Sequence, residues 1–180
     1  MSEPAKPVTF TSKILIMGYG RHGKDTVAEM LAQLLGVQFT SSSRAALEEV
    51  IYPVMQPAMG YTSLNECFED RVNHRAEWYD LICKYNSKDP TRLARKVLER
   101  SSIYVGMRSA TELQACKHAN VFDHIVWVDA SRRLPPEPES SCTVTPEMAH
   151  CVLNNNGTLE HLETQVRIWI QTILDTREHE

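Results

Sequence analysis

The segment that most constrains the fold is Gly18–Lys24 (GYGRHGK), because it stands between an apolar run and an amphipathic stretch. The run 13–17 (KILIM) predicts a short buried strand. Residues 25–35 repeat apolar side chains at helical spacing, and Gly36 is typical of a helix end. A Gly-x-x-x-x-Gly-Lys turn that joins a strand to a helix predicts a phosphate-binding loop.

Each part of this loop has a physical role. Glycine lets the backbone turn so that its N–H groups point at phosphate oxygens, and the start of the next helix adds partial positive charge. Lys24 can reach the β- and γ-phosphates and offset charge that shifts during transfer. The predicted ATP-binding residues are Gly18, Gly20, Arg21, His22, Gly23, Lys24, Asp25 and Thr26. The alternative is a glycine-rich turn that holds no ligand.

The residue after the lysine departs from the common pattern, in which serine or threonine holds Mg²⁺. Asp25 occupies that position and is suited to bind Mg²⁺ directly or through water, whereas Thr26 is suited to bond the α-phosphate. We therefore predict Asp25 as the metal residue. We expect His22 to point to solvent or to a base rather than to take part in catalysis.

Strand and helix patterns alternate along the rest of the chain. Further strands are predicted at 37–40, 103–105, 125–128 and 151–153, and further helices at 63–85, 89–100, 109–118 and 158–176. This alternation predicts an α/β fold of the P-loop NTPase type, with a mainly parallel sheet of about five strands and helices on both faces. We expect one domain over 1–180, with a loose arm at 1–11 and a proline-interrupted small lid at 131–145.

The composition excludes several classes of protein. A net charge of −4 argues against a broadly basic, non-specific nucleic-acid binder, although it is compatible with a local basic groove. No apolar run approaches the length that spans a bilayer, so we expect a cytoplasmic protein without membrane contact. The five cysteines contain no CxxC pair, which favours reduced thiols over a disulfide framework or a zinc site.

Three segments suggest a family. Residues 18–26 (GYGRHGKDT) resemble the GKDT-type phosphate loop of bacteriophage deoxynucleoside monophosphate kinases and related nucleotide kinases. Residues 103–117 (IYVGMRSATELQACK) resemble their strand, arginine turn and following helix, and 150–162 (HCVLNNNGTLEHL) resemble their closing strand, Asn-Gly turn and final helix. Residues 47–100 match less well. The resemblance implies a nucleotide-kinase fold that uses ATP and Mg²⁺.

The same phage group includes kinases that phosphorylate the hydroxymethyl group of 5-hydroxymethyluracil in DNA during thymidine hypermodification. The resemblance thus implies two acceptors. Our preferred hypothesis is this DNA base, because the chain is compact and leaves little sequence for a large lid. The second hypothesis is a free deoxynucleoside monophosphate, and the third is an ATP-binding module without catalysis. The sequence leaves the oligomeric state open.

Arginines are the candidates for binding the acceptor. The predicted helix over 63–85 places Arg71 and Arg75 four residues apart, on one face, where their planar groups suit the phosphate of a nucleotide or of DNA. Arg92 and Arg95 add positive charge on the next helix. The alternative is a solvated face with intrahelical ion pairs.

The candidate catalytic residues besides Lys24 are Asp70, Arg108 and Arg132. A hydroxyl acceptor benefits from a carboxylate that takes its proton, and Asp70 is the candidate, unless it pairs with a neighbouring arginine. A monophosphate acceptor needs no such base. Arg108 follows a predicted strand, where ligands bind in parallel sheets. Arg132, with Arg133, either closes over ATP or forms an exposed basic pair.

Overall fold

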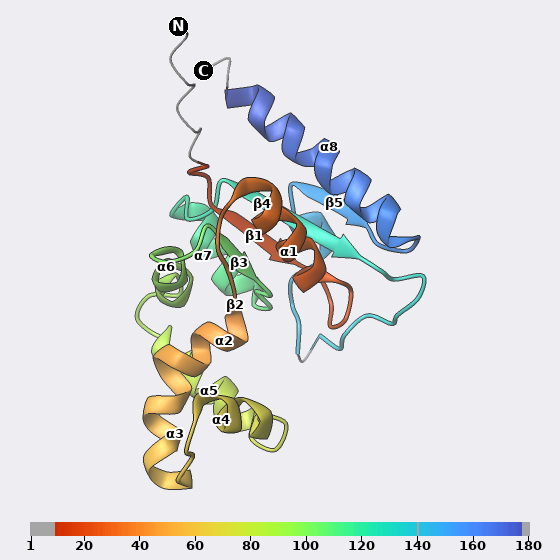
Figure 1. The fold of residues 1–180 in the computed structure, drawn as a ribbon. Coiled ribbons are helices and arrows are strands. Elements are labelled where there is room, and N and C mark those ends of the chain that lie inside the picture. Colours follow the sequence, from red (N-terminus) through yellow and green to blue (C-terminus); the bar gives the residue numbers. More distant parts are fainter. Residues whose placement is uncertain (1–9, 140, 178–180) are drawn as a thin grey trace, which may run out of the picture.

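A computed structural model describes residues 10–139 and 141–177 (Figure 1). The predicted loose arm at 1–11 falls almost entirely outside these residues. One parallel sheet has the strand order β2-β3-β1-β4-β5. Its strands are β1 (Ile14–Met17), β2 (Phe39–Ser41), β3 (Ile103–Val105), β4 (His124–Asp129) and β5 (Cys151–Asn154). The predicted α/β fold with a parallel five-stranded sheet is confirmed.

The helices connect and cover these strands. They are α1 (Lys24–Leu35), α2 (Ser42–Ala46), α3 (Tyr52–Met59), α4 (Leu64–Asp70), α5 (Arg75–Tyr85), α6 (Arg92–Leu98), α7 (Ala110–His118) and α8 (Leu159–Arg177). A π-helical turn, η1 (Leu47–Ile51), joins α2 to α3, and a 3₁₀ turn, η2 (Pro146–Met148), precedes β5. In the described part of the chain, no helix combines the length and apolar character needed to cross a bilayer.

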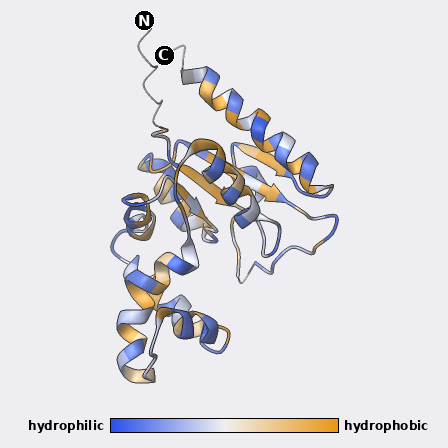
Figure 2. Cartoon of the chain, in the orientation of Figure 1, coloured by the Kyte–Doolittle hydropathy of each residue, from blue (hydrophilic) through white to orange (hydrophobic). Residues whose placement is uncertain are grey.

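The strands are buried on both faces, which explains why they read as continuous apolar runs. In β1, Leu15 and Met17 enter one core, while Ile14 and Ile16 enter the other. The second core lies under α1 and α8, and the first lies under α2, η1, α6 and α7. Figure 2 shows the resulting pattern, with apolar strands at the centre and alternating polar and apolar stripes along α8.

A helical insertion, which we define as residues 42–100, separates β2 from β3 and extends away from the sheet (Figure 1). The prediction of one helix over 63–85 was wrong, because α4 ends at Asp70 and α5 begins only at Arg75. The side chain of Arg71 donates to the Phe68 carbonyl (2.6 Å) and that of Asn73 donates to Asp70 (2.7 Å), which stabilises the intervening turn. Arg71 and Arg75 therefore do not share one helical face.

The start of the next helix also differs from the prediction. The helix α6 begins at Arg92 with Thr91 as its N-cap, whereas an N-cap at Asp89 would begin it at Pro90, two residues earlier. Asp89 Oδ1 accepts hydrogen bonds from the backbone N–H (2.9 Å) and the hydroxyl (2.7 Å) of Thr91, in the turn that precedes the helix. No helix was predicted for 42–59, where α2, η1 and α3 occur.

A pair of leucines in α1 tests the packing of this helix on the sheet. Leu31 is fully buried in the second core, whereas Leu34 is 38% exposed on the same helix. We expect Leu31→Ala to lower the free energy of unfolding by ~2–5 kcal/mol, because it leaves a cavity. Leu34→Ala should cost less than ~1 kcal/mol, since less apolar surface is lost. Urea unfolding followed by circular dichroism measures both, and equal losses would contradict the assigned faces.

Candidate phosphate-transfer site

The phosphate loop, which we define as residues 18–23, joins β1 to α1 and requires glycine at two positions. Gly18 has φ +149° and Gly23 has φ +95°, which are conformations that other residues rarely adopt. A side chain at Gly18 would place its Cβ 2.6 Å from the Val128 carbonyl oxygen, and one at Gly23 would overlap Asn155. The backbone of the loop therefore lies directly against β4 and the turn after β5.

Lys24, the first residue of α1, turns its side chain back into the loop. Its Nζ donates a hydrogen bond to the Tyr19 carbonyl (2.7 Å). Burial lowers the pKa of Lys24, and Arg108 lowers it further, whereas Glu137 and Asp25 act in the opposite direction. The ammonium group is thus held inside the loop by a carbonyl oxygen, in the position that a lysine serving bound phosphate requires.

Two more side chains converge on the loop from distant parts of the sequence. Arg108, just after β3, donates from Nη1 to Glu137 Oε1 (2.6 Å), and the other oxygen of Glu137 accepts the backbone N–H of Gly20 (2.8 Å). Burial acts to raise the pKa of Glu137, but the hydrogen bond and charge of Arg108, with Gly20 and Lys24, hold it below its ordinary value. Arg108 was predicted here, whereas Glu137 was missed, because nothing in a proline-rich segment indicates where its side chain points.

His22 does not point to solvent, so that part of the prediction was wrong. Its side chain is fully buried, and Nδ1 accepts the backbone N–H of Ala130 (3.0 Å) directly after β4. The ring also packs edge-on against Tyr19, with 5.4 Å between centroids. Burial lowers the pKa of His22, although Asp129 acts the other way, and an Nδ1 that accepts an N–H carries no proton. His22 is therefore a neutral group that fastens the loop to the end of β4.

The turn after β5 fastens the loop from the other side. Asn155 donates to the His22 carbonyl (2.9 Å), and its own carbonyl accepts the Arg133 Nε (3.0 Å). Asn156 accepts the backbone N–H of Arg132 (2.8 Å) and donates to Asp129 (2.9 Å). The sequence indicated only a turn at 154–157. The run of three asparagines before Gly157 was the signal for these side-chain contacts.

In its described residues, the predicted lid at 131–145 contains turns but no helix or strand. Ser140 lies outside the described residues. The region borders the phosphate loop through Glu137 and is attached to Arg108, whose carbonyl accepts the Thr143 N–H (2.9 Å). Arg132 is exposed, and only its backbone is held in place. Its role in closing over ATP stays a prediction.

The residues next to Lys24 fit a nucleotide-held Mg²⁺. Asp25 is exposed at the second position of α1, close enough to raise the pKa of Lys24, and Thr26 is partly buried beside it. Among the described residues, no group of three or more His, Cys, Asp or Glu side chains is placed to hold a metal ion. Mg²⁺ usually takes one or two carboxylates and draws its other ligands from water and substrate phosphates, so an exposed Asp25 beside Lys24 is a candidate ligand.

The fold as a whole is similar to that of a solved kinase structure. Shikimate kinase from Acinetobacter baumannii is similar over 96% of this chain and 98% of its own, with a TM-score of 0.53 and 17% identity. The chain has a P-loop kinase fold. A sugar kinase from Janibacter sp. gives a TM-score of 0.47 at 17% identity, over 90% of this chain and 95% of its own. Neither protein-family models nor the curated proteins gave a match to the sequence.

On this P-loop kinase fold, the helical insertion begins beside the phosphate loop. Ser42 donates to the Gly106 carbonyl (3.1 Å), which ties the start of α2 to the end of β3. Arg44, two residues further along, packs its guanidinium 3.9 Å from the centroid of the Phe68 ring, and Arg71 packs on the same ring at 3.8 Å. Arg44 was missed by sequence reasoning. Its position just after a parallel strand was the available signal.

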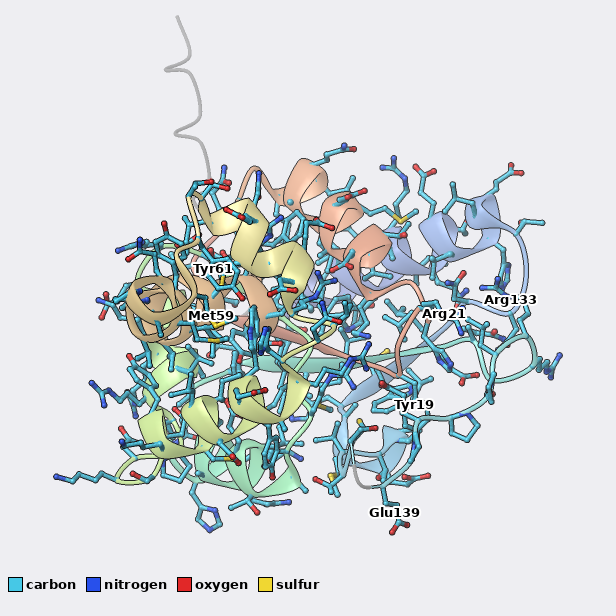
Figure 3. The ribbon with its side chains drawn as sticks, turned by 90° about the horizontal axis from the view of Figure 1, so that it is seen from below. Tyr19, Arg21, Met59, Tyr61, Arg133 and Glu139 are labelled. Atoms are coloured by element: carbon cyan, nitrogen blue, oxygen red, sulfur yellow. The ribbon has the colours of Figure 1, made fainter. Side chains whose placement is uncertain are left out.

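Asp70 lies in a network within the helical insertion. Oδ2 accepts the hydroxyl of Tyr61 (2.7 Å) and lies 3.1 Å from His74 Nε2, while Oδ1 accepts from Asn73 (2.7 Å). The hydrogen bonds from Tyr61 and Asn73 lower the pKa of Asp70, which makes it a weaker base. Figure 3 shows Tyr61 on the insertion, apart from Tyr19 of the phosphate loop. The structure thus brings Asp70 to Tyr61 and His74.

The remaining predicted arginines lie elsewhere on the insertion. Arg75 is exposed at the start of α5. Arg92 packs 3.9 Å from the centroid of the Tyr85 ring, and Arg95 donates to the Thr91 hydroxyl (2.9 Å). An open depression of about 470 Å³ is lined by Arg92, Arg95 and Lys96, together with Tyr85, Glu49, Asp89 and Glu99. Because its cations and carboxylates balance, its net field is small.

The position of Asp25 allows a test of its role in binding Mg²⁺. Asp25→Asn removes a negative charge with little change of shape, so we expect weaker ATP binding that recovers as Mg²⁺ is raised. Calorimetric titration with ATP across a series of Mg²⁺ concentrations measures this. Glu29→Gln is the matched control, because Glu29 is exposed one turn further along α1. If neither variant shows weaker ATP binding at any Mg²⁺ concentration, Asp25 does not take part in binding the metal.

Proposed function

We propose that this protein transfers the γ-phosphate of ATP to a deoxynucleotide acceptor. The observation that carries the proposal is the ammonium of Lys24 inside a glycine loop, with Arg108 reaching the same loop from the end of β3. Backbone N–H groups, a helix start and two cations at one point form a site for a polyphosphate. A turn that serves only the fold has no need for a partly buried lysine with an arginine beside it.

The reaction would use these groups in a fixed order. On ATP binding, the Lys24 ammonium gives up its hydrogen bond to the Tyr19 carbonyl and bonds to phosphate oxygens instead. The exchange costs little free energy, because the ammonium already lies inside the loop. Arg108 then stabilises charge on the phosphoryl group as it transfers. Asp25 would hold Mg²⁺ directly or through water, and the ion would supply further positive charge to the phosphates. Arg132, at the start of the lid, supplies further positive charge over ATP.

Our preferred acceptor is the hydroxymethyl group of 5-hydroxymethyluracil in DNA. The support is the resemblance of the GKDT loop to that phage group, together with the exposed Arg75 on the insertion, whose guanidinium suits a phosphate of the DNA backbone. Arg92 and Arg95 are exposed as well, but neighbouring carboxylates balance their charge. Asp70, the candidate proton acceptor, belongs to the same insertion.

A free deoxynucleoside monophosphate is the second candidate, and a separate observation favours it. The chain that follows β2 and β3 presents Ser42 and Arg108 beside the phosphate loop, with Arg44 two residues after Ser42, and no carboxylate comes directly after either strand. Both oxygens of Asp70 are already hydrogen-bonded. An anionic acceptor needs cations and no base, so it fits these residues.

Lys24 provides the test of catalysis. We expect Lys24→Ala to fold normally and to lose phosphoryl transfer by ~2–4 orders of magnitude, because one charge that stabilises the transition state is gone. Labelled-ATP transfer measures the activity, and circular dichroism measures the fold. Lys88→Ala is the control, since Lys88 is exposed in the turn before α6. Near-normal transfer by Lys24→Ala would contradict the proposal, and ATP binding without any transfer by the wild type would favour a non-catalytic module.

Asp70 separates the two acceptors. With DNA that contains 5-hydroxymethyluracil, Asp70→Asn should lower kcat by ~10²-fold or more and leave KM nearly unchanged, because an amide cannot take the proton. With free monophosphates, we expect the change to raise KM rather than lower kcat. Asp80→Asn is the control, because Asp80 is exposed on α5.

DNA binding gives an independent test of the preferred acceptor. If Arg75 contacts a DNA phosphate, Arg75→Ala should reduce the slope of log Kd against log salt by roughly 0.9. Fluorescence anisotropy with labelled duplex DNA measures this slope. Transfer to free monophosphates alone, with no salt-sensitive DNA binding, would overturn the preferred acceptor and leave the second candidate.

A further inference from the structure

The carboxylate of Glu137 occupies the mouth of the phosphate loop. One oxygen accepts the backbone N–H of Gly20 (2.8 Å), and the other accepts the Arg108 guanidinium (2.6 Å). Glu137 is separated by 117 residues from Gly20 and by 29 from Arg108, so tertiary structure alone makes these contacts. An N–H of the loop and an arginine at the end of a strand are the donors that a phosphate would use there.

The contact is close enough to exclude a second anion. A Cβ built on Gly20 would lie 3.3 Å from Oε1 of Glu137, which means that the carboxylate lies directly against the loop backbone. A phosphate oxygen bound to the N–H of Gly20 would need the space that Glu137 fills. The chain therefore places its own negatively charged group where a phosphate group of the ligand would be.

The charges explain why this arrangement is stable. Lys24 is partly buried, and its burial and the charge of Arg108 both lower its pKa. Glu137 is the group that acts most strongly in the opposite direction. Two cations that face each other in a partly desolvated loop repel unless an anion lies near both. Glu137 supplies that anion through a hydrogen bond to one cation and through its charge to the other.

We propose that Glu137 is a built-in competitor of nucleotide, which fills the phosphate loop in the free protein and is displaced when ATP binds. The inference rests on the proposed function in assigning the loop to phosphate. Displacement of Glu137 breaks its hydrogen bond with Arg108. The entry of ATP thus frees the guanidinium to bind the phosphoryl group.

Competition of this kind lowers the apparent affinity in a simple way. When only a fraction of the molecules has an open loop, the apparent Kd rises by the inverse of that fraction. A carboxylate held by one backbone N–H and one arginine would keep roughly nine-tenths of the molecules closed, which corresponds to a roughly tenfold weaker binding of phosphate groups. Removing the carboxylate should recover this factor.

The test compares ligands with and without phosphates. Glu137→Gln and Glu137→Ala should each bind ATP and inorganic tripolyphosphate roughly three- to tenfold more tightly than the wild type, with the larger gain for Ala. Their affinity for adenosine should not change, because adenosine has no group that competes with the carboxylate. Glu139→Gln is the matched control, since Glu139 is exposed in the same segment. Calorimetry on the full-length chain measures all three ligands.

Several outcomes would overturn the inference. Unchanged or weaker tripolyphosphate binding by both Glu137 variants, with normal unfolding temperatures, would mean that the carboxylate does not compete. An equal gain for adenosine would mean that the substitution acts on the structure of the whole site. Either result leaves the proposed function standing if the wild type transfers phosphate to an acceptor. Failure of the wild type to bind ATP or tripolyphosphate would overturn both.

Discussion

The structure depends on one electrostatic constraint, which is that positive groups converging on a glycine loop must be balanced by an anion. Parallel strands end at the same edge of the sheet, and β1 lies between β3 and β4. The loop after β1 is therefore flanked by Arg108 after β3 and by Ala130 after β4. In the structure the Glu137 carboxylate satisfies these donors, and we propose that a polyphosphate replaces it.

The shape of the loop is held by groups that touch no phosphate. His22 is fastened to the end of β4, and Asn155 is fastened to the carbonyl of His22. Gly23 leaves no room for a side chain beside Asn155. Such contacts fix the directions of backbone N–H groups before a ligand arrives, which is the form of preorganisation that makes charge stabilisation effective.

The helical insertion, where we propose that the acceptor binds, is built independently of the loop. The helical insertion lies between β2 and β3 and has its own polar network of Asp70, Tyr61 and His74. It is tied to the loop region through Ser42 and the end of β3. Acceptor choice can therefore change through the insertion while the phosphate loop stays the same, which is why fold similarity to shikimate kinase carries no acceptor with it.

The sequence by itself determined the strands, α1, α8 and the phosphate loop. These follow from local patterns, because a buried strand needs a continuous apolar run and a phosphate loop needs glycine at fixed spacing. The break between α4 and α5 at 71–74 could not be predicted from the sequence. Side-chain contacts of Arg71 and Asn73 end α4 there, and the periodicity of apolar residues does not reveal such contacts.

Only the tertiary structure decided which polar side chains meet. It buried His22, brought Arg44 onto Phe68 and placed Glu137 in the phosphate loop. These contacts join residues far apart in the chain, and their partners have no sequence spacing that a pattern can detect. A polar side chain in an irregular segment carries no periodic signal, so its direction is set by the backbone donors and charges that it finds when the chain folds.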